Sequence, residues 1–379
     1  VYTIPATAPF GDALVAGLLN GDVISLPAGD PLALARVTLL MPTRRACRAI
    51  QEAFLRASGS AAMLLPRILP LGDIDDDEGG LGDREASADD MIPPAISSLR
   101  RQLLLARLVR AWDNAAPRGK AADPNPRRSM DQVIRLAAEL ANFLDATQIE
   151  GLTLDGLKDL APAQYADHWQ SVLEFLLIVT RHWPEVLAEE GVLDPATRRN
   201  TTLRKLAQSW ATTPPPGPVI TAGSTGTVPA TADLMGVIAR LPQGMIVLPG
   251  LDTATDEEAW NALDATHPQY ALKRLLNRIG INRAEVHVWP ILPPVEHEAT
   301  ARATLLHEAL RPAVTTHVWH NENLIDEAAV TGLALAECDD LQQEAGVIAL
   351  RMRAALQIDE ATGRRDQTAA LVTADRRLA

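Results

Sequence analysis

The sequence predicts an α/β fold: a parallel sheet domain with a helical insertion, followed by the start of a second α/β lobe. Three observations predict it. Short apolar runs alternate with helical stretches at both ends of the chain, which is the rhythm of βαβ units. The rhythm stops at Ile96 and resumes at Val219, and the residues between have helical periodicity. A strand, cap and basic helix start near the N-terminus also recurs at the end of the chain.

The first lobe is expected to join residues 1–92 and 214–290 in one sheet. Its expected strands are apolar runs that are short for helices: Val1–Ile4, Val37–Met41, Leu64–Ile68, Val219–Ala222 and Met245–Leu248. Its expected helices are Gly11–Leu19, Ala46–Ala57 and Ala230–Leu241. The second of these places Cys47, Ile50 and Phe54 on one face, at spacings of three and four.

The two other expected units are a helical insertion at 93–213 and a truncated second lobe at 296–379. In the insertion, one apolar stripe predicts a packed helix face: Leu99, Leu103, Ala106 and Val109. Trp183 is expected to pack within the same block. Pro290–Val295 is expected to be a linker. The second lobe is expected to place strands Gly332–Ala336 and Ala369–Thr373 around a helix at Leu341–Leu356.

Composition excludes several classes of protein. The net charge of −13 over 379 residues argues against a uniformly basic nucleic-acid coat, although not against a local basic groove. No apolar run approaches the roughly 18 residues of a membrane span, so no membrane partner is expected. The two cysteines, Cys47 and Cys338, are too few for a disulfide framework or a four-cysteine metal site. These features predict a cytoplasmic protein.

The recurring segment carries a pair of arginines after a helix cap. It runs over Val37–Ala46 and again over Ala369–Leu378. Thr43 and Asp375 suit the N-cap position. Arg44 and Arg45 follow the first cap, and arginine at a helix N-terminus opposes the macrodipole. Either a nucleic-acid phosphate backbone neutralises these two positive charges, or the arginines are solvated surface charge.

The end of the second copy predicts a longer protein. The chain stops at Ala379, one turn into the helix that Asp375 would open. A strand without its packing partner is not a stable layer.

The place of a phosphate-binding loop lacks the residues for it. Pro5–Asp12 has one glycine and no lysine, and the first lysine of the chain is Lys120. Without the lysine and a nest of glycine amides, nucleotide phosphates have no cradle. Asp252 is a weak magnesium candidate and is interpreted as a turn residue. We therefore assign no catalytic residue, metal ligand or cofactor to this segment.

A loop of small residues at Gly223–Thr227 is the second candidate site. It follows an expected strand, where open α/β sheets bind ligands. Ser224 and Thr225 could hold a phosphate or cap the following helix. A nucleotide-using α/β transferase with its site here is the alternative function. His317 and His320 lack the other members of a metal-ligand pattern.

Several strings resemble one known family, the AddB subunit of bacterial AddAB helicase–nucleases, most closely its alphaproteobacterial type. The strings are Tyr2–Pro5, Leu39–Ala49, Leu65–Asp73, Ala222–Gly226, Val247–Asp252 and His267–Leu276. The resemblance spans nearly the whole chain.

The resemblance implies a protein that processes broken DNA ends for recombinational double-strand break repair together with the AddA subunit. It implies superfamily 1 helicase-like architecture, with two RecA-like lobes and a C-terminal nuclease. Related AddB subunits recognise the Chi sequence in single-stranded DNA, and some hold an iron–sulphur cluster, for which two cysteines are too few. The missing phosphate-loop lysine implies a lobe without the motor. Thr43, Arg44 and Arg45 would then contact DNA phosphates, and Ser224 and Thr225 would line the same channel.

Overall fold

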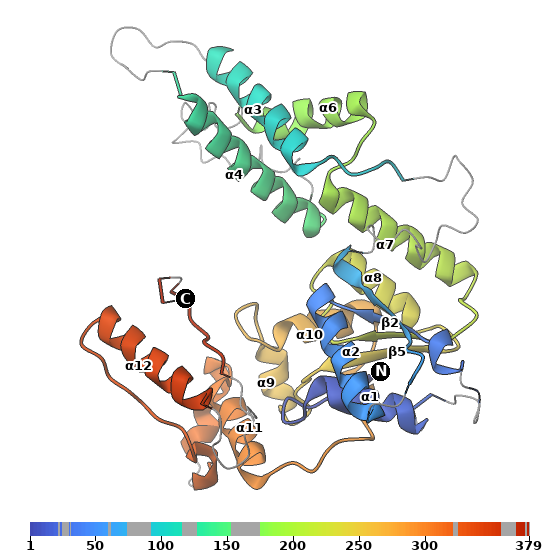
Figure 1. Cartoon of the computed structure of the whole chain (residues 1–379), viewed down its shortest axis with the longest axis vertical. Coiled ribbons are helices and arrows are strands. Elements are labelled where there is room, and N and C mark those ends of the chain that lie inside the picture. The colour runs from blue at the N-terminus through green and yellow to red at the C-terminus, as the bar shows by residue number, and fades with distance from the viewer. Residues whose placement is uncertain are drawn as a thin grey trace.

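A computed structural model gives the structure of the chain. It describes residues 1–21, 23–24, 30, 32–59, 62–73, 92–115, 127–152, 175–320, 325–357, 369–375 and 377–378. These residues form an α/β protein whose sheet domain lies below a block of helices, with a smaller helical segment beside it (Figure 1).

Six parallel strands form one sheet in the order β3-β2-β4-β5-β1-β6. The strands are β1 (Tyr2–Ile4), β2 (Thr38–Met41), β3 (Arg67–Pro70), β4 (Val219–Ala222), β5 (Gly244–Pro249) and β6 (His287–Val288). β2 and β4 pair in parallel, with Leu40 opposite Thr221. The segments before and after the helical block therefore belong to the same sheet, as the sequence predicted.

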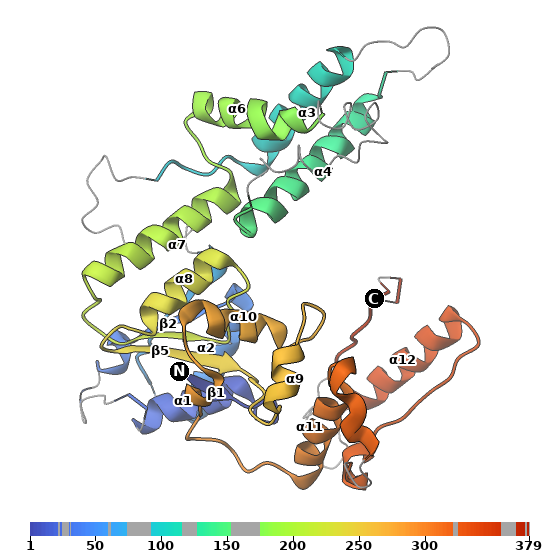
Figure 2. The ribbon, with the colours of Figure 1, turned by 180° about the vertical axis from the view of Figure 1, so that it is seen from behind.

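Helices cover both faces of the sheet (Figures 1 and 2). On one face, α1 (Phe10–Asn20) and α2 (Arg44–Ser58) pack Leu14, Ile50 and Phe54 onto the sheet. On the other face lie α7 (Pro195–Thr212), α8 (Pro229–Ile238) and α10 (Tyr270–Ile279), with α9 (Glu257–Ala262) beside them. The short helices of this domain are η1 (Leu34–Arg36), η2 (Leu71–Asp73) and η7 (Arg283–Glu285). Apolar burial on both faces explains why the central strands are mostly apolar.

The helical block lies in the chain between β3 and β4. It contains α3 (Ser98–Ala115), α4 (Met130–Ile149), a π-helical turn η6 (Ile178–His182) and α6 (Trp183–Glu190), and α7 joins it to the sheet domain. Its core includes Leu105, Val109, Val133 and the fully buried Trp183. The packing of Trp183 within this block confirms the prediction for that residue.

Two local predictions are wrong. β3 begins at Arg67 rather than Leu64, because Pro66 has no amide to donate and Arg67 donates the first bond, to the carbonyl of Val37 at 2.9 Å. In α3, Leu99 and Leu103 are 67% and 54% exposed. The buried face of α3 instead carries Arg101, Leu105, Ala106 and Val109.

Residues after the linker form helices, without the strands that the sequence predicted. The helices are α11 (His297–Ala309), η8 (Ala313–His320), η9 (Glu327–Val330) and α12 (Leu341–Ala355). Gly332–Ala336 and Ala369–Thr373 are not strands; they have no neighbouring strand among the described residues to complete a ladder. Asp375 accepts from the amide of Arg377 at 2.9 Å and opens no helix there. Arg376 lies outside the described residues.

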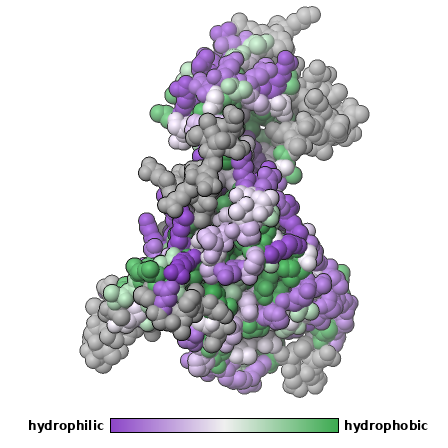
Figure 3. Space-filling model, turned by 90° about the vertical axis from the view of Figure 1, so that its right-hand side faces the viewer, coloured by the Kyte–Doolittle hydropathy of each residue, from purple (hydrophilic) through white to green (hydrophobic). Residues whose placement is uncertain are grey.

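No helix in the described part of the chain has the length and apolar character that crossing a bilayer requires. On the face shown in Figure 3, hydrophilic and hydrophobic residues interleave over both the helical block and the sheet domain.

Candidate nucleic-acid interface

The two predicted site segments lie side by side at the carboxyl edge of the sheet. Thr43–Arg45 follows β2 and Gly223–Thr227 follows β4, and these strands are parallel neighbours. Cδ of Pro42 lies 3.7 Å from the position that a Cβ would occupy on Gly223. The fold thus brings together segments that are about 180 residues apart in sequence, as parallel pairing requires.

This edge is a topological switch point. The connection that leaves β2 runs through α2 to β3, and the one that leaves β4 runs through α8 to β5 in the opposite direction along the sheet. The two helices also cover opposite faces. In open α/β sheets, the crevice between two such strands is where ligands bind. The switch point therefore falls between the two predicted segments.

Thr43 fixes the start of α2, as predicted. Its backbone is extended, with φ −144°, and its hydroxyl oxygen accepts from the amide of Ala46 at 3.1 Å. Arg44 and Arg45 are the first two residues of the helix and, like Thr43, are exposed. The first turn contains no acidic residue. Two positive charges thus lie where the helix dipole is also positive, so an anion at this point would be stabilised by both.

The Gly223–Thr227 loop is closely packed. Gly223 and Gly226 have φ values of +75° and +59°. A Cβ on Gly226 would lie 2.5 Å from Cδ1 of Leu275 in α10, so only glycine fits there. The hydroxyl oxygen of Ser224 accepts from the amide of Gly226 at 3.2 Å.

Ser224 and Thr225 are placed differently by this loop. Ser224 is only 8% exposed, whereas Thr225 is half-exposed. α8 begins at Pro229 without a side-chain cap, so the cap function that the sequence allowed for Ser224 or Thr225 is not observed. Thr225 therefore has the better access to a ligand.

Helix α10 braces the carboxyl-edge loops, a function that sequence reasoning missed. Gln269 accepts from the amide of Asp252 at 3.1 Å and donates to the carbonyl of Gly250 at 2.9 Å. Arg274 donates to the carbonyl of Thr227 at 2.5 Å and lies 3.8 Å from Glu150 at the end of α4. Both residues lie in the string His267–Leu276. This string was noted only for its resemblance to a family, and it contains no pattern that would predict these contacts.

Asp252 is a turn residue, as expected, and its side chain also forms a hydrogen bond with a histidine. Its carboxylate accepts from the amides of Ala254 and Thr255 at 2.8 and 3.1 Å. The other oxygen lies 2.6 Å from Nδ1 of His307 in α11. Burial raises the pKa of Asp252, but the hydrogen bond and charge of His307 and the amide of Ala254 outweigh it, so the pKa lies below its ordinary value.

The turn between β1 and α1 is short and closed. The amide of Ala8 donates to the carbonyl of Pro5 at 3.0 Å, and α1 starts after Pro9 without a side-chain cap. A Cβ on Gly250, which follows β5, would lie 3.5 Å from the Cβ of Ala6. The turn is therefore packed against the neighbouring loop at the place where a phosphate-binding loop would be needed.

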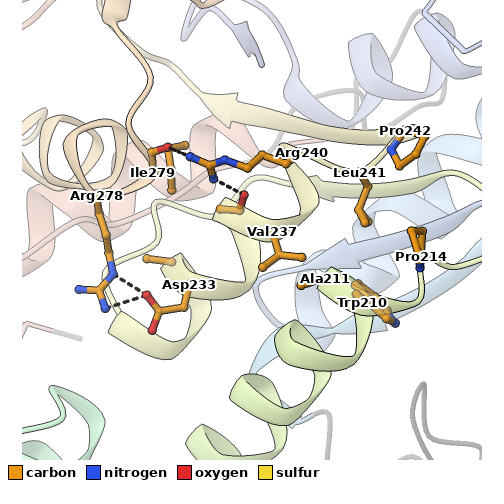
Figure 4. Close-up of a pocket in the computed structure, with 12 residues that line it drawn as sticks. Trp210, Ala211, Pro214, Asp233, Val237, Arg240, Leu241, Pro242, Arg278 and Ile279 are labelled. Atoms are coloured by element: carbon orange, nitrogen blue, oxygen red, sulfur yellow. Dashed lines mark hydrogen bonds and ion pairs between the residues drawn. The ribbon is translucent and has the colours of Figure 1, made fainter.

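One groove of about 410 Å³ lies away from these residues, between the end of α7, α8 and α10 (Figure 4). Its two arginines are engaged. Arg278 pairs with Asp233 at 2.7 Å, and Arg240 donates to the carbonyls of Gly236 and Ile279. None of the five predicted site residues lines it.

No protein-family model matches the chain, and no curated protein does so either. Within the described residues, no group of three or more His, Cys, Asp or Glu side chains is arranged to hold a metal ion.

Proposed function

We propose that this chain is the non-motor helicase-like part of an AddB-type subunit, in which the carboxyl edge of the sheet guides single-stranded DNA. The observation that carries this proposal is the place of Arg44 and Arg45. They begin α2 at the switch point between β2 and β4, with Thr225 on the neighbouring loop. A backbone of phosphates is a ligand that positive charge and helix amides favour together.

The sheet supports the further proposal that residues 1–92 and 214–290 form a RecA-like lobe. All six strands are parallel, and the first strand lies inside the sheet between β5 and β6. The closed turn after β1 supports a lobe that has lost the motor. In this proposal, α12 belongs to the start of a second such lobe.

The proposed partners follow from the same assignment. They are an AddA-type helicase–nuclease subunit and the single-stranded and duplex ends of broken DNA, in the cytoplasm. The chain itself needs no cofactor for guiding a strand, because phosphate contacts are made by arginine, hydroxyl and amide groups.

Two binding measurements on one preparation of the chain test this function. Fluorescently labelled single-stranded oligonucleotides and labelled ATP are titrated separately, at low ionic strength, where phosphate contacts are strongest. The proposal predicts saturable binding of DNA and none of ATP. If the chain binds ATP instead, and Thr225→Val abolishes that binding, the result would support a nucleotide-using transferase with its site at Gly223–Thr227.

A further inference from the structure

Arg274 joins α10 to the loop that follows β4. Its Nη2 donates to the carbonyl of Thr227 at 2.5 Å. The next residue, Leu275, packs against the same loop, with its Cδ1 2.5 Å from the place that a Cβ would take on Gly226. These contacts fix the guanidinium of Arg274 relative to the loop that carries Thr225.

The charge of Arg274 is only loosely compensated. Among the described residues it has one ion-pair partner, Glu150, whose carboxylate oxygen lies 3.8 Å from Nη2, beyond the length of a hydrogen bond. One turn further along α10, Arg278 holds Asp233 closely, with Nη2 at 2.7 Å and Nε at 2.8 Å. Of these two arginines, Arg274 is therefore the one whose charge is open to another anion.

Arg274 also has hydrogen-bond donors to spare. A guanidinium carries five N–H groups in a planar fork. Apart from the bond from Nη2 to Thr227, this guanidinium donates no hydrogen bond within the part of the chain that the structure describes, and its side chain is 48% exposed. A fork of this kind matches two oxygens of a phosphate. Arg274 can thus bind a phosphate while it keeps its contact with the loop.

The loop after β4 lies between Arg274 and the arginine pair at the start of α2. At one end of the loop, the place of a Cβ on Gly223 is 3.7 Å from Cδ of Pro42, which comes just before the cap of α2. At the other end, the carbonyl of Thr227 accepts from Arg274. Thr225 is at the middle of the loop. The three groups therefore follow one another across the carboxyl edge of the sheet.

The partner of Arg274 belongs to the helical block. Glu150 is the C-cap residue of α4, and this end of α4 points toward the sheet domain (Figures 1 and 2). The side chain of Glu150 is 46% exposed. An exposed ion pair at this distance contributes little stability, whereas a bidentate bond between arginine and phosphate is charge-assisted and strong. A phosphate would therefore displace Glu150 from Arg274.

We propose that Arg274 binds a phosphate of the DNA strand, on the other side of the loop from the arginine pair of α2, and that Glu150 competes with this phosphate for the guanidinium. The inference rests on the proposed function. It extends the DNA contacts to a third element, α10. It also gives the helical block an influence on DNA affinity, because the block supplies the competing carboxylate.

A double-mutant cycle on the full chain separates this role from that of a loop brace. A fluorescently labelled oligothymidylate is titrated at several salt concentrations into the wild type, Arg274→Ala, Glu150→Gln and the variant with both changes. Arg278→Ala removes the same charge from the next turn of α10 and is the first control. Glu139→Gln removes an exposed carboxylate from the same helix as Glu150 and is the second, made with and without Arg274→Ala.

Arg274→Ala should weaken binding by about tenfold relative to Arg278→Ala, the scale of a hydrogen bond to a charged group. It should also reduce the slope of log affinity against log salt by roughly 0.7, the value for one phosphate contact on a single strand. Glu150→Gln should strengthen binding by about two- to fivefold beyond the effect of Glu139→Gln, the scale of an exposed ion pair. In the Arg274→Ala background the two carboxylate variants should bind alike.

Two results would overturn the inference. If Arg274→Ala binds DNA as Arg278→Ala does, Arg274 makes no phosphate contact. If Glu150→Gln has the same effect with and without Arg274, the carboxylate does not compete for this guanidinium. In both cases, binding that still depends on Arg44 and Arg45 would leave the proposed function intact. A wild type that binds no DNA would contradict the proposed function itself, and the inference with it.

Discussion

Pro42, which follows β2, lies against Gly223, which follows β4, at 3.7 Å from the place of its missing Cβ. This packing joins the two loops that carry Arg44, Arg45 and Thr225. It exists because β2 and β4 pair directly, although the whole helical block separates them in sequence. The proposed DNA contacts lie along this edge.

Gly226→Ala should destabilise the sheet domain by about 2–4 kcal/mol. About 1 kcal/mol comes from a non-glycine residue at φ +59°, and the rest comes from overlap of the new Cβ with Leu275. Urea unfolding measures the change. Gly280→Ala is the matched control: its φ is +69°, but the new Cβ meets only the end of Arg240 at 3.8 Å. Equal losses in both variants would show that the overlap has no effect.

Asp194→Ala should destabilise the helical block by about 3–5 kcal/mol, because it removes the buried partner of Arg101, which then keeps only the more exposed Asp145. Asp194 is 1% exposed and pairs with Arg101 at 2.8 Å. It also accepts from the indole of Trp183 at 2.9 Å and from Gln148 at 2.7 Å.

The control for Asp194 is Asp131→Ala, which breaks an exposed pair with Arg135 on α4. We expect a loss below about 0.5 kcal/mol there. Urea unfolding followed by hydrogen exchange in the α3 and α4 peptides separates the helical block from the sheet. A small loss in Asp194→Ala would mean that the network can rearrange without it.

The sequence predicts the sheet well because the central strands are short runs of mostly apolar residues. The run at Val219–Ala222 could be assigned to its exact bounds, and the cap at Thr43 could be assigned from one hydroxyl and its position. Both predictions depend on local sequence signals, and residues that are distant in the chain do not change their outcome.

The sequence fails where a distant partner decides the outcome. Arg101 is buried because Asp194 and Asp145 reach it from other parts of the helical block. This turns the face of α3 away from Leu99 and Leu103. The apolar runs at Gly332–Ala336 and Ala369–Thr373 have strand composition but no strand beside them in the described structure, and a ladder needs both partners.

The same reason explains what was missed at the site. The brace by Gln269 and Arg274 and the pairing of Asp252 with His307 join residues that are distant in the chain or chemically unremarkable. Periodicity and motif spacing carry no information about such interactions. Locating the switch point requires knowing the order of the strands in the sheet, and a single sequence does not determine that order.

Acid should release residues 297–320 as pH falls through and below the ordinary range of carboxylate pKa values. The pKa values of Asp252 and Glu308 are lowered. For Glu308 the largest cause is the hydrogen bond from Arg311, acting against burial. A carboxylate with a lowered pKa in the folded state contributes stability that is present above its unfolded pKa and lost as pH falls through the folded one.

Small-angle scattering measures this release as an increase in the radius of gyration. The increase should begin below about pH 4, near and under the unperturbed carboxylate values, while circular dichroism of the sheet domain is still unchanged. Asp252→Asn should expand at a higher pH than the wild type. An expansion that coincides with global unfolding would contradict independent release.

The chain should not hydrolyse ATP, with or without single-stranded DNA. Pro5–Asp12 has no lysine and one glycine, and the turn is closed against Gly250. Phosphate release is measured with the purified chain. Thr7→Ala is the control for a contaminating ATPase, because a substitution in this chain would leave the activity of a contaminant unchanged. If DNA stimulates phosphate release, and substitutions in the Pro5–Asp12 loop abolish that release, the assignment of a non-motor lobe is wrong.

The most direct test of the central claim is the affinity of Arg44→Ala plus Arg45→Ala for single-stranded DNA at several salt concentrations. The control, Arg135→Ala plus Arg181→Ala, removes the same charge from exposed sites on the helical block. Both are measured in the chain alone and with the proposed AddA-type partner added. Stability should change by no more than about 0.5 kcal/mol in either variant.

Arg44→Ala plus Arg45→Ala should bind all sequences more weakly and about equally so, because phosphate contacts carry no base information. The slope of log affinity against log salt should fall by roughly 0.7 for each phosphate that the variant no longer binds, and the control should bind as the wild type does. Unchanged affinity and salt slope in Arg44→Ala plus Arg45→Ala would contradict the account and leave these arginines as solvated surface charge.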